Sequence, residues 1–581
     1  MECCRQLDLA GRAPAGRRLI RLLAAFLLLG GAFLPAIAQA PAQETNRTAP
    51  VEQLFAEGRW QEIVYRVRAM SAPSADHYYY YGTALAKLGR WDDARRAFLA
   101  GHRLQPYDNR FPIELAGVDF KQKRYAAAAK WLHRALRIDS KDAYANDFLG
   151  TVYFLQRNLE AALKYWNRIG KPQIENVRLE PELRVDAVLL DRAFAFSPGS
   201  TLELRDLLAA KARVRGLEIF SNYAFGLDAR EDGRFDLVFR ARERNGWGEN
   251  KWEALLSLFR GIFQQTVYPE YFNLDRSAIN IVSLVRWDAE KRRLAASVAG
   301  PLEHNAKWRY DLGLDMRNEN WDIRGSFTAP APLLGALNLR KEAVSAGITW
   351  FESGRWRWST GFELSHRDFR GIVPGSVLTP ALLSQGYQLK HLAEFNYQLW
   401  RVAESRFVST TGASSQIGRI WSQPEHSFVK LQSWFAADWL PQSSGDDYEM
   451  QERVRVGRTF GQIPFDELFM LGLEHDNDLW LRAHIGTSDG RKGSAPLGGT
   501  YALSNWEIDK NLYENGFLSL KLGPFLDTGK ITESSSGLGS QKWLWDTGVQ
   551  AKVHVLRVGV IFSYGKDLRS GNNAFYATVG R

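Results

Sequence analysis

The spacing of hydrophobic and polar positions changes along the chain and divides it into parts. Residues 51–170 have helical spacing, residues 183–245 mix strand-like and helical segments, and residues 246–581 alternate with a period of two. A period near 3.6 is typical of amphipathic helices, and a period of two is typical of strands with one buried face. The sequence therefore predicts a multidomain protein with a helical array, a small α/β module and a large β-domain.

Small and large residues recur every 34 positions in residues 51–170. The sets in register are Gly82, Ala116 and Gly150; Ala94, Ala128 and Ala162; Trp91, Tyr125 and Leu159; and Phe98, Leu132 and Trp166. We expect the small residues where the two helices of a pair touch, and the large ones between pairs. The period resembles that of the tetratricopeptide (TPR) repeat, an all-α solenoid. The resemblance implies a concave surface that binds another protein, with a plain spacer as the alternative.

Residues 183–245 have the predicted element order β-α-α-β-β. We expect a strand over Leu183–Phe196, a helix capped by Thr201, a second short helix over Val214–Phe220, and two strands around a turn at Asp232-Gly233. The sequences "FSPGS" and "DGRFDLVFRARE" resemble a POTRA domain, a module associated with polypeptide transport. The resemblance implies a sheet edge that pairs with an extended client. A generic βααββ linker domain is the alternative.

Apolar side chains alternate with charged or small ones in residues 246–581. Trp308, Tyr310, Leu312, Leu314 and Met316 alternate with Arg309, Asp311, Gly313, Asp315 and Arg317, and similar runs begin at Arg355, Leu518 and Val553. This is the pattern of a transmembrane antiparallel β-barrel, although a soluble β-sandwich also alternates. Sixteen strands fit the length, because about 21 residues are then available for each strand and loop, and a crossing takes about 9–11.

The N-terminus has the pattern of an export signal. Arg17, Arg18 and Arg21 precede an apolar run over residues 22–34, and a small-residue cleavage site, Ala36-Ile37-Ala38, follows. This predicts a secretory signal peptide over residues 1–38, with an uncleaved anchor as the alternative. No apolar run of 18 follows residue 40, so a membrane-embedded chain must cross the bilayer as a closed barrel. The only cysteines, Cys3 and Cys4, precede the cleavage site, which excludes disulfides and thiolate metal sites from the mature chain.

Composition and charge narrow the set of partners. The chain has 20 Trp and 21 Tyr, residue types that are enriched at membrane–water interfaces. The formal net charge is +10, but outside the signal segment Lys and Arg are scattered singly among acids and aromatics. This distribution does not favour nucleic-acid binding.

Two stretches near the C-terminus carry a family resemblance. They are Pro464–Glu507, with "PFDELFMLGLEHDNDLWLRAHIG" followed by "APLGGTYALSNWE", and Gly523–Ile531, "GPFLDTGKI". They resemble the inward-folded loop and adjoining strands of the POTRA-barrel superfamily. These are the BamA/TamA-type outer-membrane assembly and secretion proteins, also called bacterial surface antigens. The resemblance covers about 400 residues, from the POTRA-like module to the C-terminus.

The loop motif of this family is an aromatic or aliphatic residue, then Arg, Gly and an aromatic residue. The matching residues are Leu481, Arg482, Ala483 and His484 in the loop, and Asp527 and Gly529 in the F-x-D-x-G strand motif. The resemblance implies that Arg482 pairs with an acid on the barrel wall, and we select Asp527. Two unrelated lumen charges are the alternative. The motif's Gly and aromatic are replaced, and the chain does not end in the family's usual aromatic residue.

The candidate catalytic motifs lack the context that their chemistry needs. Gly486–Gly490 matches G-x-S-x-G, but it lies in a glycine-rich loop without the strand and helix of a nucleophile elbow. Gly523–Lys530 has five residues between its glycines, and Ile531 replaces the hydroxyl of a phosphate loop. The sequence contains no H-E-x-x-H. We therefore expect no enzymatic activity, no cofactor and no metal.

These features predict an outer-membrane factor that inserts outer-membrane proteins or translocates polypeptides. The expected partners are client polypeptides, a periplasmic protein bound by the TPR repeats, and outer-membrane lipid, with the TPR and POTRA-like domains in the periplasm. One alternative is a polysaccharide-export porin with a TPR arm, which predicts no POTRA-like module. The others are a passive tether or adhesin, and a barrel lipase that would need Ser488 near a His and an acid.

Overall fold

The computed structural model describes residues 50–325, 332–373, 377–422, 424–441, 447–515, 517–533, 537–540, 542–555 and 558–580. The predicted signal peptide lies outside these ranges. The chain divides into two compact units. The first contains the residues up to Arg178 together with 197–204 and 225–239, and the second contains 179–196, 205–224 and 240–581. No helix in the described ranges is long and apolar enough to cross a bilayer.

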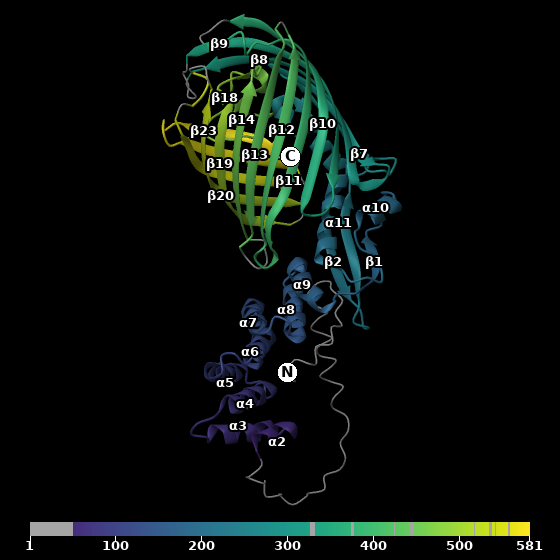
Figure 1. Cartoon of the computed structure of the whole chain (residues 1–581), viewed down its shortest axis with the longest axis vertical. Helices are drawn as coiled ribbons and strands as arrows, with labels where there is room; N and C mark the ends of the chain where they lie inside the picture. Colours follow the sequence, from purple (N-terminus) through teal and green to yellow (C-terminus); the bar gives the residue numbers. More distant parts are fainter. Residues whose placement is uncertain are drawn as a thin grey trace, which may run out of the picture. The chain divides into compact units, whose positions relative to one another are not determined.

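Consecutive helices pack against one another at the start of the described chain (Figure 1). They are α2 (Val51–Ala56), α3 (Trp60–Arg68), α4 (Ala75–Lys87), α5 (Trp91–Leu104), α6 (Arg110–Lys121), α7 (Tyr125–Ile138), α8 (Ala143–Leu155) and α9 (Leu159–Trp166). The element lengths follow the 34-residue period, because α4, α6 and α8 begin near equivalent positions and α5, α7 and α9 follow after short turns.

The glycines of the repeat allow large side chains to pack closely. A Cβ on Gly82 would lie 2.5 Å from the Phe98 ring, and one on Gly150 would lie 2.3 Å from the Trp166 ring. Both rings are fully buried. Phe98 and Trp166 therefore contact the glycine of their own helix pair, whereas the sequence predicted the large residues between pairs.

The small module has the elements β1 (Ile174–Glu180), α10 (Ala187–Ala193), α11 (Leu204–Leu217), β2 (Phe220–Ala229) and β3 (Phe235–Glu243). Its sheet order is β1-β3-β2, so β1 and β2 are the sheet's edges. The succession β-α-α-β-β is the predicted one, but its first three elements are not those predicted: the strand β1 precedes residue 183, the predicted strand contains α10, and the single helix α11 covers most of the two predicted helices.

The predicted strand over Leu183–Phe196 is wrong, because this segment contains helix α10. The side chain of Asp186 caps the helix by accepting a hydrogen bond from the Val188 amide at 2.8 Å. Leu189, Leu190 and Ala193 are buried, and this spacing suits a helix rather than a strand.

The cap of helix α11 also differs from the prediction. The Leu204 amide donates to Oδ1 of Asn167 at 2.8 Å. The hydroxyl of Thr201 donates instead to the backbone oxygen of Gly170 at 3.4 Å. The start of α11 is therefore held by a residue that follows the last repeat helix, which ties the module to the helical array within the first unit.

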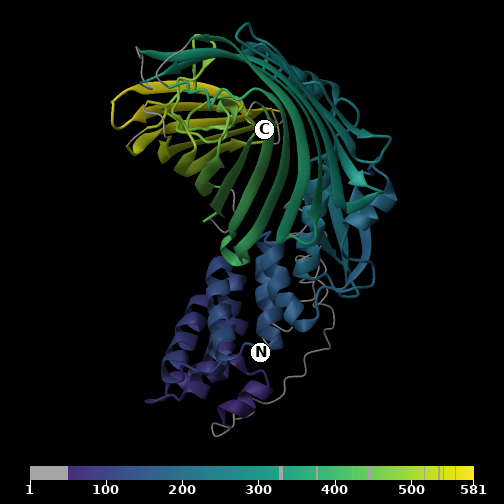
Figure 2. The same ribbon diagram turned by 45° about the horizontal axis from the view of Figure 1, so that its top comes forward.

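A large antiparallel sheet follows from Thr266 onward. Its strands are β4 (Thr266–Val267), β5 (Glu270–Leu274), β6 (Ile279–Trp287), β7 (Lys291–Leu302), β8 (Asn305–Arg324), β9 (Leu333–Phe351), β10 (Trp356–Val373), β11 (Gly386–Val402), β12 (Phe407–Trp421), β13 (His426–Trp439), β14 (Tyr448–Gly461), β19 (Thr500–Glu514), β20 (Leu518–Thr532), β21 (Leu544–Val555), β22 (Val558–Asp567) and β23 (Asn573–Gly580). Each strand from β6 to β23 pairs antiparallel with the next strand of the wall, and the order returns from β23 to β4. The sheet thus curls into a barrel (Figures 1 and 2).

The barrel wall has one strand fewer than predicted. β4 and β5 pair with β6 in the same register as far as Tyr271, with a shift before Leu274, so they form a single interrupted strand. With it, the wall has fifteen strands in the described residues instead of sixteen. Residues 251–264 are helical, as α12 (Lys251–Phe259) and η2 (Ile262–Gln264), because Asn250 caps α12 by accepting hydrogen bonds from two of its first amides. The wall therefore begins at Thr266, later than the predicted boundary at residue 246.

The predicted alternation is clear on strand β8. The side chains of Leu312, Leu314 and Met316 are exposed outside the barrel, with exposed fractions of 52%, 40% and 38%. Between them, Asp315 forms ion pairs with Arg293 of β7 and Arg317 of β8. This strand therefore separates an apolar outer face from a charged inner face.

Candidate functional site

A long loop leaves the barrel wall and fills part of its interior. Strands β14 and β19 are direct neighbours, so residues 462–499 leave the wall and return without interrupting it. The loop contains η4 (Phe465–Glu467), β15 (Phe469–Met470), β16 (Thr487–Ser488), β17 (Arg491–Lys492) and β18 (Leu497–Gly498). Lys492 of β17 is the backbone register partner of Trp321 in wall strand β8, to which β17 runs parallel. The loop therefore connects its own strands with a distant part of the wall.

Arg482 and Asp527, the predicted pair, lie together in the structure. Nε of Arg482 donates to Oδ2 of Asp527 at 2.9 Å, and Nη2 donates to Oδ1 at 2.6 Å. The Arg482 amide also donates to Oδ2 at 3.0 Å. Both side chains are buried, with exposed fractions of 1% and 0%. A bidentate pair of this kind fixes both the position and the orientation of the guanidinium.

Further wall residues surround the same guanidinium. Nη1 of Arg482 donates to Glu507 at 2.7 Å and to Gln550 at 2.8 Å. The ring of Phe525, the aromatic residue of the F-x-D-x-G motif, lies 3.9 Å below it from centroid to Cζ. Glu507 is shared with Lys552 at 2.7 Å. A single loop cation is therefore bound by strands β19, β20 and β21 together.

The other motif residues also contact the wall. Leu481 is fully buried, and the Ala483 amide donates to Asp546 of β21 at 2.7 Å. Nδ1 of His484 lies 3.0 Å from the same carboxylate oxygen. Gly529 leaves little space, because a Cβ there would lie 3.2 Å from Leu471 of the loop.

Gly565 is a site residue that the sequence analysis missed. A Cβ at this position of β22 would lie 2.6 Å from the backbone oxygen of Arg482. The loop backbone can therefore approach β22 only because residue 565 has no side chain. The one available signal, a glycine within an alternating strand, is too common to single it out.

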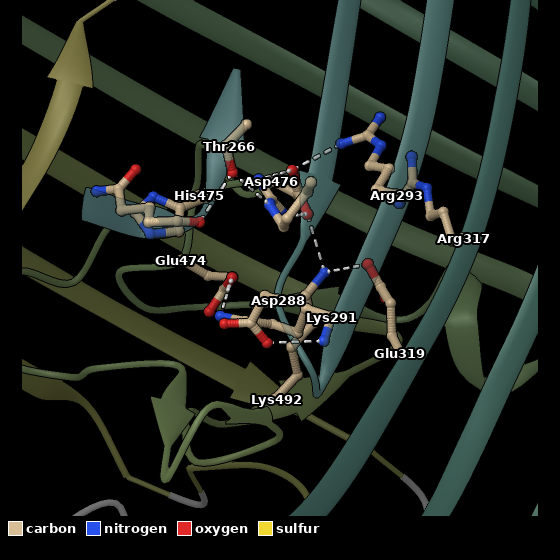
Figure 3. A network of polar contacts seen from close by, with 12 residues as sticks. Thr266, Asp288, Lys291, Arg293, Arg317, Glu319, Glu474, His475, Asp476 and Lys492 are labelled. Atoms are coloured by element: carbon tan, nitrogen blue, oxygen red, sulfur yellow. Dashed lines mark hydrogen bonds and ion pairs between the residues drawn. The ribbon is translucent and has the colours of Figure 1, made fainter. Parts of the chain in front are cut away.

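A second group of contacts holds loop residues 474–476 (Figure 3). Asp476 forms ion pairs with Arg286 at 2.9 Å, Arg293 at 2.6 Å and Lys492 at 3.1 Å. Glu474 pairs with Lys291 at 3.3 Å and accepts a hydrogen bond from Thr487. Figure 3 shows Asp476 beside Arg293 of strand β7, to which it is joined by a dashed contact.

This group of contacts reaches both sides of the junction between the first and last strands. On one side, Asp476 binds Arg286, whose Nε donates to the hydroxyl of Thr266 in β4 at 3.1 Å. On the other side, the ring nitrogens of His475 lie 3.2 and 3.3 Å from the hydroxyl of Tyr576 in β23. We call Thr266, Arg286, Asp476, His475 and Tyr576 the junction path. One loop segment thus links the two strands that meet where the barrel closes.

A third group of contacts surrounds η4 of the loop. Glu467 is buried and forms ion pairs with Lys341 at 3.1 Å and Lys390 at 2.9 Å. Its backbone oxygen accepts from Lys430 at 2.9 Å, and Asp466 lies 3.3 Å from Arg367. Because these cations come from β9, β10, β11 and β13, the loop is held by ionic contacts around much of the wall.

The G-x-S-x-G segment does not form a nucleophile site in the described residues. Ser488 lies in the two-residue strand β16, and its hydroxyl is 3.4 Å from the adjacent Asp489. β16 leads into a hairpin with β17 rather than into a helix. The geometry required for a nucleophile elbow is therefore missing here.

No family model matches the sequence, and no curated protein matches it. Among solved structures, the chain is similar to BamA from Haemophilus ducreyi lacking POTRA domains 1–3, over 70% of this chain and 85% of that one, with 11% identity and a TM-score of 0.40. It is similar to CdiB from Escherichia coli over 70% and 76%, with 12% identity and a TM-score of 0.45. A CdiB from Acinetobacter baumannii matches over 70% and 73%, with 11% identity and a TM-score of 0.41.

Proposed function

We propose that this protein is an outer-membrane β-barrel that inserts outer-membrane proteins or translocates polypeptides. In this proposal the helical array and the POTRA-like module lie in the periplasm. The array binds a periplasmic partner, the module binds an extended client, and the barrel junction receives client strands. The observation that carries the proposal is the junction path, in which one internal loop connects both strands of the junction.

The location in a membrane is supported by apolar surfaces that face away from the protein. The outer face of the barrel is apolar on strands such as β8. Helix α12 and η2 also expose apolar side chains, namely Trp252, Leu255, Leu256, Phe259, Ile262 and Phe263. Two charged residues of this segment contact the protein instead, because Glu253 is buried and Arg260 forms an ion pair with Glu270 at 2.7 Å. A helix with this orientation favours an apolar surrounding.

The junction has properties that suit strand exchange. The first wall strand is interrupted, with two residues in β4 and five in β5. A backbone N–H or C=O group that is unpaired in lipid costs several kcal/mol of free energy. A client strand that pairs with an edge at this position satisfies such groups on both strands and is stabilised there. The loop segment that bridges the junction, residues 474–476, is held by ion pairs and hydrogen bonds. Other loop residues, such as Leu471 and Leu481, belong to a hydrophobic cluster with the wall.

The periplasmic parts have surfaces of the kinds that the proposal needs. β1 and β2 form the edges of the small sheet, and strand addition to an edge is a general way to bind an extended peptide. Stacked helix pairs offer a continuous surface to a folded partner. The proposal is non-enzymatic. The internal loop and the module with β-α-α-β-β order favour it over the polysaccharide-export porin.

Crosslinking of the junction tests the proposal. The side chain of Gln264 donates to the backbone oxygen of Ala577 in β23 at 3.3 Å, so Gln264→Cys with Ala577→Cys places thiols across the junction. Cells that carry only this variant are treated with a short thiol crosslinker, and proteomics measures the outer-membrane and secreted proteins. We expect a large loss in one of these fractions after crosslinking and none before it. The affected fraction distinguishes insertion from secretion.

The matched control is Thr410→Cys with Ala436→Cys, which joins register partners on β12 and β13 away from the junction. Its crosslinking is expected to leave both protein fractions unchanged. If the junction pair is crosslinked completely and both fractions stay normal, the junction is not where clients act and the proposal is wrong.

A further inference from the structure

Three aspartates form a row across neighbouring strands on the inner face of the barrel. Asp527 of β20 is the register partner of Asp546 of β21, and Asp546 is the register partner of Asp567 of β22. Their exposed fractions are 0%, 0% and 4%. Buried carboxylates at adjacent positions repel one another unless cations compensate them.

The nearby lysine and arginine side chains compensate the negative charge of only some of these carboxylates. Arg482 binds Asp527 and Glu507, and Lys552 binds Glu507 and Asp509. Among the described residues, no lysine or arginine forms an ion pair with Asp546 or Asp567. The ionisable group that faces both of them is His484, with Nδ1 3.0 Å from Asp546 and Nε2 3.9 Å from Asp567. Two buried carboxylates thus face one imidazole.

Asp546 also has an oxygen atom without a partner. Its Oδ2 accepts from the Ala483 amide and lies beside His484, whereas Oδ1 has no hydrogen-bond partner among the described residues, although it is buried. A buried carboxylate oxygen without a partner is costly. It therefore points to a cation as the missing partner.

We infer that His484, Asp546 and Asp567 form a binding site for one divalent transition-metal ion, such as Zn²⁺ or Mn²⁺. One nitrogen or oxygen from each side chain lies within 4.8 Å of the others. Two atoms that are each about 2 Å from the same tetrahedral ion lie about 3.3 Å apart, so the 3.9 Å between Nε2 of His484 and Asp567 requires a small approach of the side chains when the ion binds. An imidazole with two carboxylates is a donor set that suits these metals.

The surrounding contacts orient the proposed ligands. Asp546 is held by the Ala483 amide, which donates to its Oδ2 at 2.7 Å. Asp567 is held by the Arg569 amide at 2.9 Å and by the hydroxyl of Ser570 at 2.5 Å. Water supplies the remaining ligands. The bound ion joins the loop motif to strands β21 and β22, which precede the last strand, and this role does not depend on what the barrel transports.

Metal binding by the purified full-length protein tests the site. The detergent-solubilised chain is stripped with a chelator and dialysed against micromolar ZnCl₂ or MnCl₂, and the bound metal is measured by mass spectrometry. We expect about one ion per wild-type chain and at least a tenfold loss of affinity in Asp546→Asn and Asp567→Asn. Asp315→Asn, which alters a lumen carboxylate on β8, is the control and keeps the full stoichiometry.

Two further measurements cover the case in which the variants fail to fold, which heat-modifiability on gels detects. X-ray absorption of the wild-type Zn²⁺ complex is expected to show one imidazole with oxygen ligands, and metal is expected to raise the thermal unfolding temperature. If the folded wild-type chain binds no ion at these concentrations, or binds one without an imidazole, the inference is wrong. His484 then serves only as a contact between the two carboxylates.

Discussion

The helical array and the barrel interior build their buried contacts over different distances along the chain. In the array, Gly82 and Phe98 meet between consecutive helices. In the barrel, Arg286 meets Asp476 across 190 positions, and Arg482 meets Asp527 across 45. The packing of a repeat can therefore be inferred from the spacing of its residues in the sequence. The ion pairs of the barrel interior depend instead on the register of many strands. The same difference separates the expected effects of mutations in the two regions.

Removal of the loop arginine is expected to have the largest effect. Arg482→Ala leaves Asp527 and Glu507 buried without their cation, which costs about 3–5 kcal/mol of stability. Thermal unfolding of the purified protein, followed by heat-modifiability, measures the loss. Arg357→Ala on β10 removes an exposed ion pair with Glu394 and is expected to cost less than about 1 kcal/mol. Equal losses would mean that the buried pair is not a main support of the loop.

A larger side chain at a repeat glycine is expected to have a smaller and local effect. Gly150→Leu forces atoms against Trp166, where even a Cβ is 2.3 Å away, and overpacking costs about 1–3 kcal/mol. Hydrogen exchange is expected to rise in α8 and α9 and to stay unchanged in the barrel strands. Ala126→Leu, at an exposed position of α7, is the control. A matching rise of exchange in the barrel would contradict the separation of the two regions.

Loss of one hydroxyl in the junction path is expected to have a smaller effect on the stability of the barrel. Tyr576→Phe removes the hydrogen bond to His475, a change worth about 0.5–1.5 kcal/mol. We expect faster amide exchange in β23 than in the wild type, with β12 unaffected. Tyr564→Phe, on the exposed side of β22, is expected to leave β23 unchanged. If both variants show the same amide exchange in β23, the hydrogen bond between Tyr576 and His475 does not stabilise this strand.

The smallest expected effect is a pH dependence of the array. Burial lowers the pKa of His102 from its ordinary value of 6.5, and the nearby Arg134 guanidinium lowers it further. The unfolded chain takes up a proton below about pH 6.5 while the folded His102 resists it, so stability present above this pH is lost as the pH falls through it. Hydrogen exchange in α5 should rise from pH 7.5 to 5.5, and less so in His102→Phe. An equal rise in both proteins would assign the effect to other groups.

The sequence predicted the elements that local periodicity defines. It indicated the 34-residue repeat, the two strands on either side of Asp232-Gly233 and the alternation on β8. It missed helix α10 and helix α12, although Asp186 and Asn250 are both capping residues at their starts. In both segments the spacing of the apolar residues suits a helix as well as a strand, so the spacing alone does not distinguish the two.

The candidate site could be predicted only where a motif named its residues. The structure brings Arg482 and Asp527 together, but Asp546, Asp567 and Gly565 were not singled out, because their importance comes from the register of β20, β21 and β22. The same holds for Tyr576 and His475, which lie 101 positions apart. No spacing rule in a single sequence shows which strands a loop will touch.

The count of wall strands has a consequence for the direction of the chain at the closure. When every neighbour is antiparallel, an odd number of strands leaves the first and the last pointing the same way. A regular antiparallel ladder cannot form between them, whereas one additional strand placed there would run opposite to both. In the described residues, the fifteen strands therefore leave the two strands at the closure without the antiparallel neighbour that every other wall strand has on both sides.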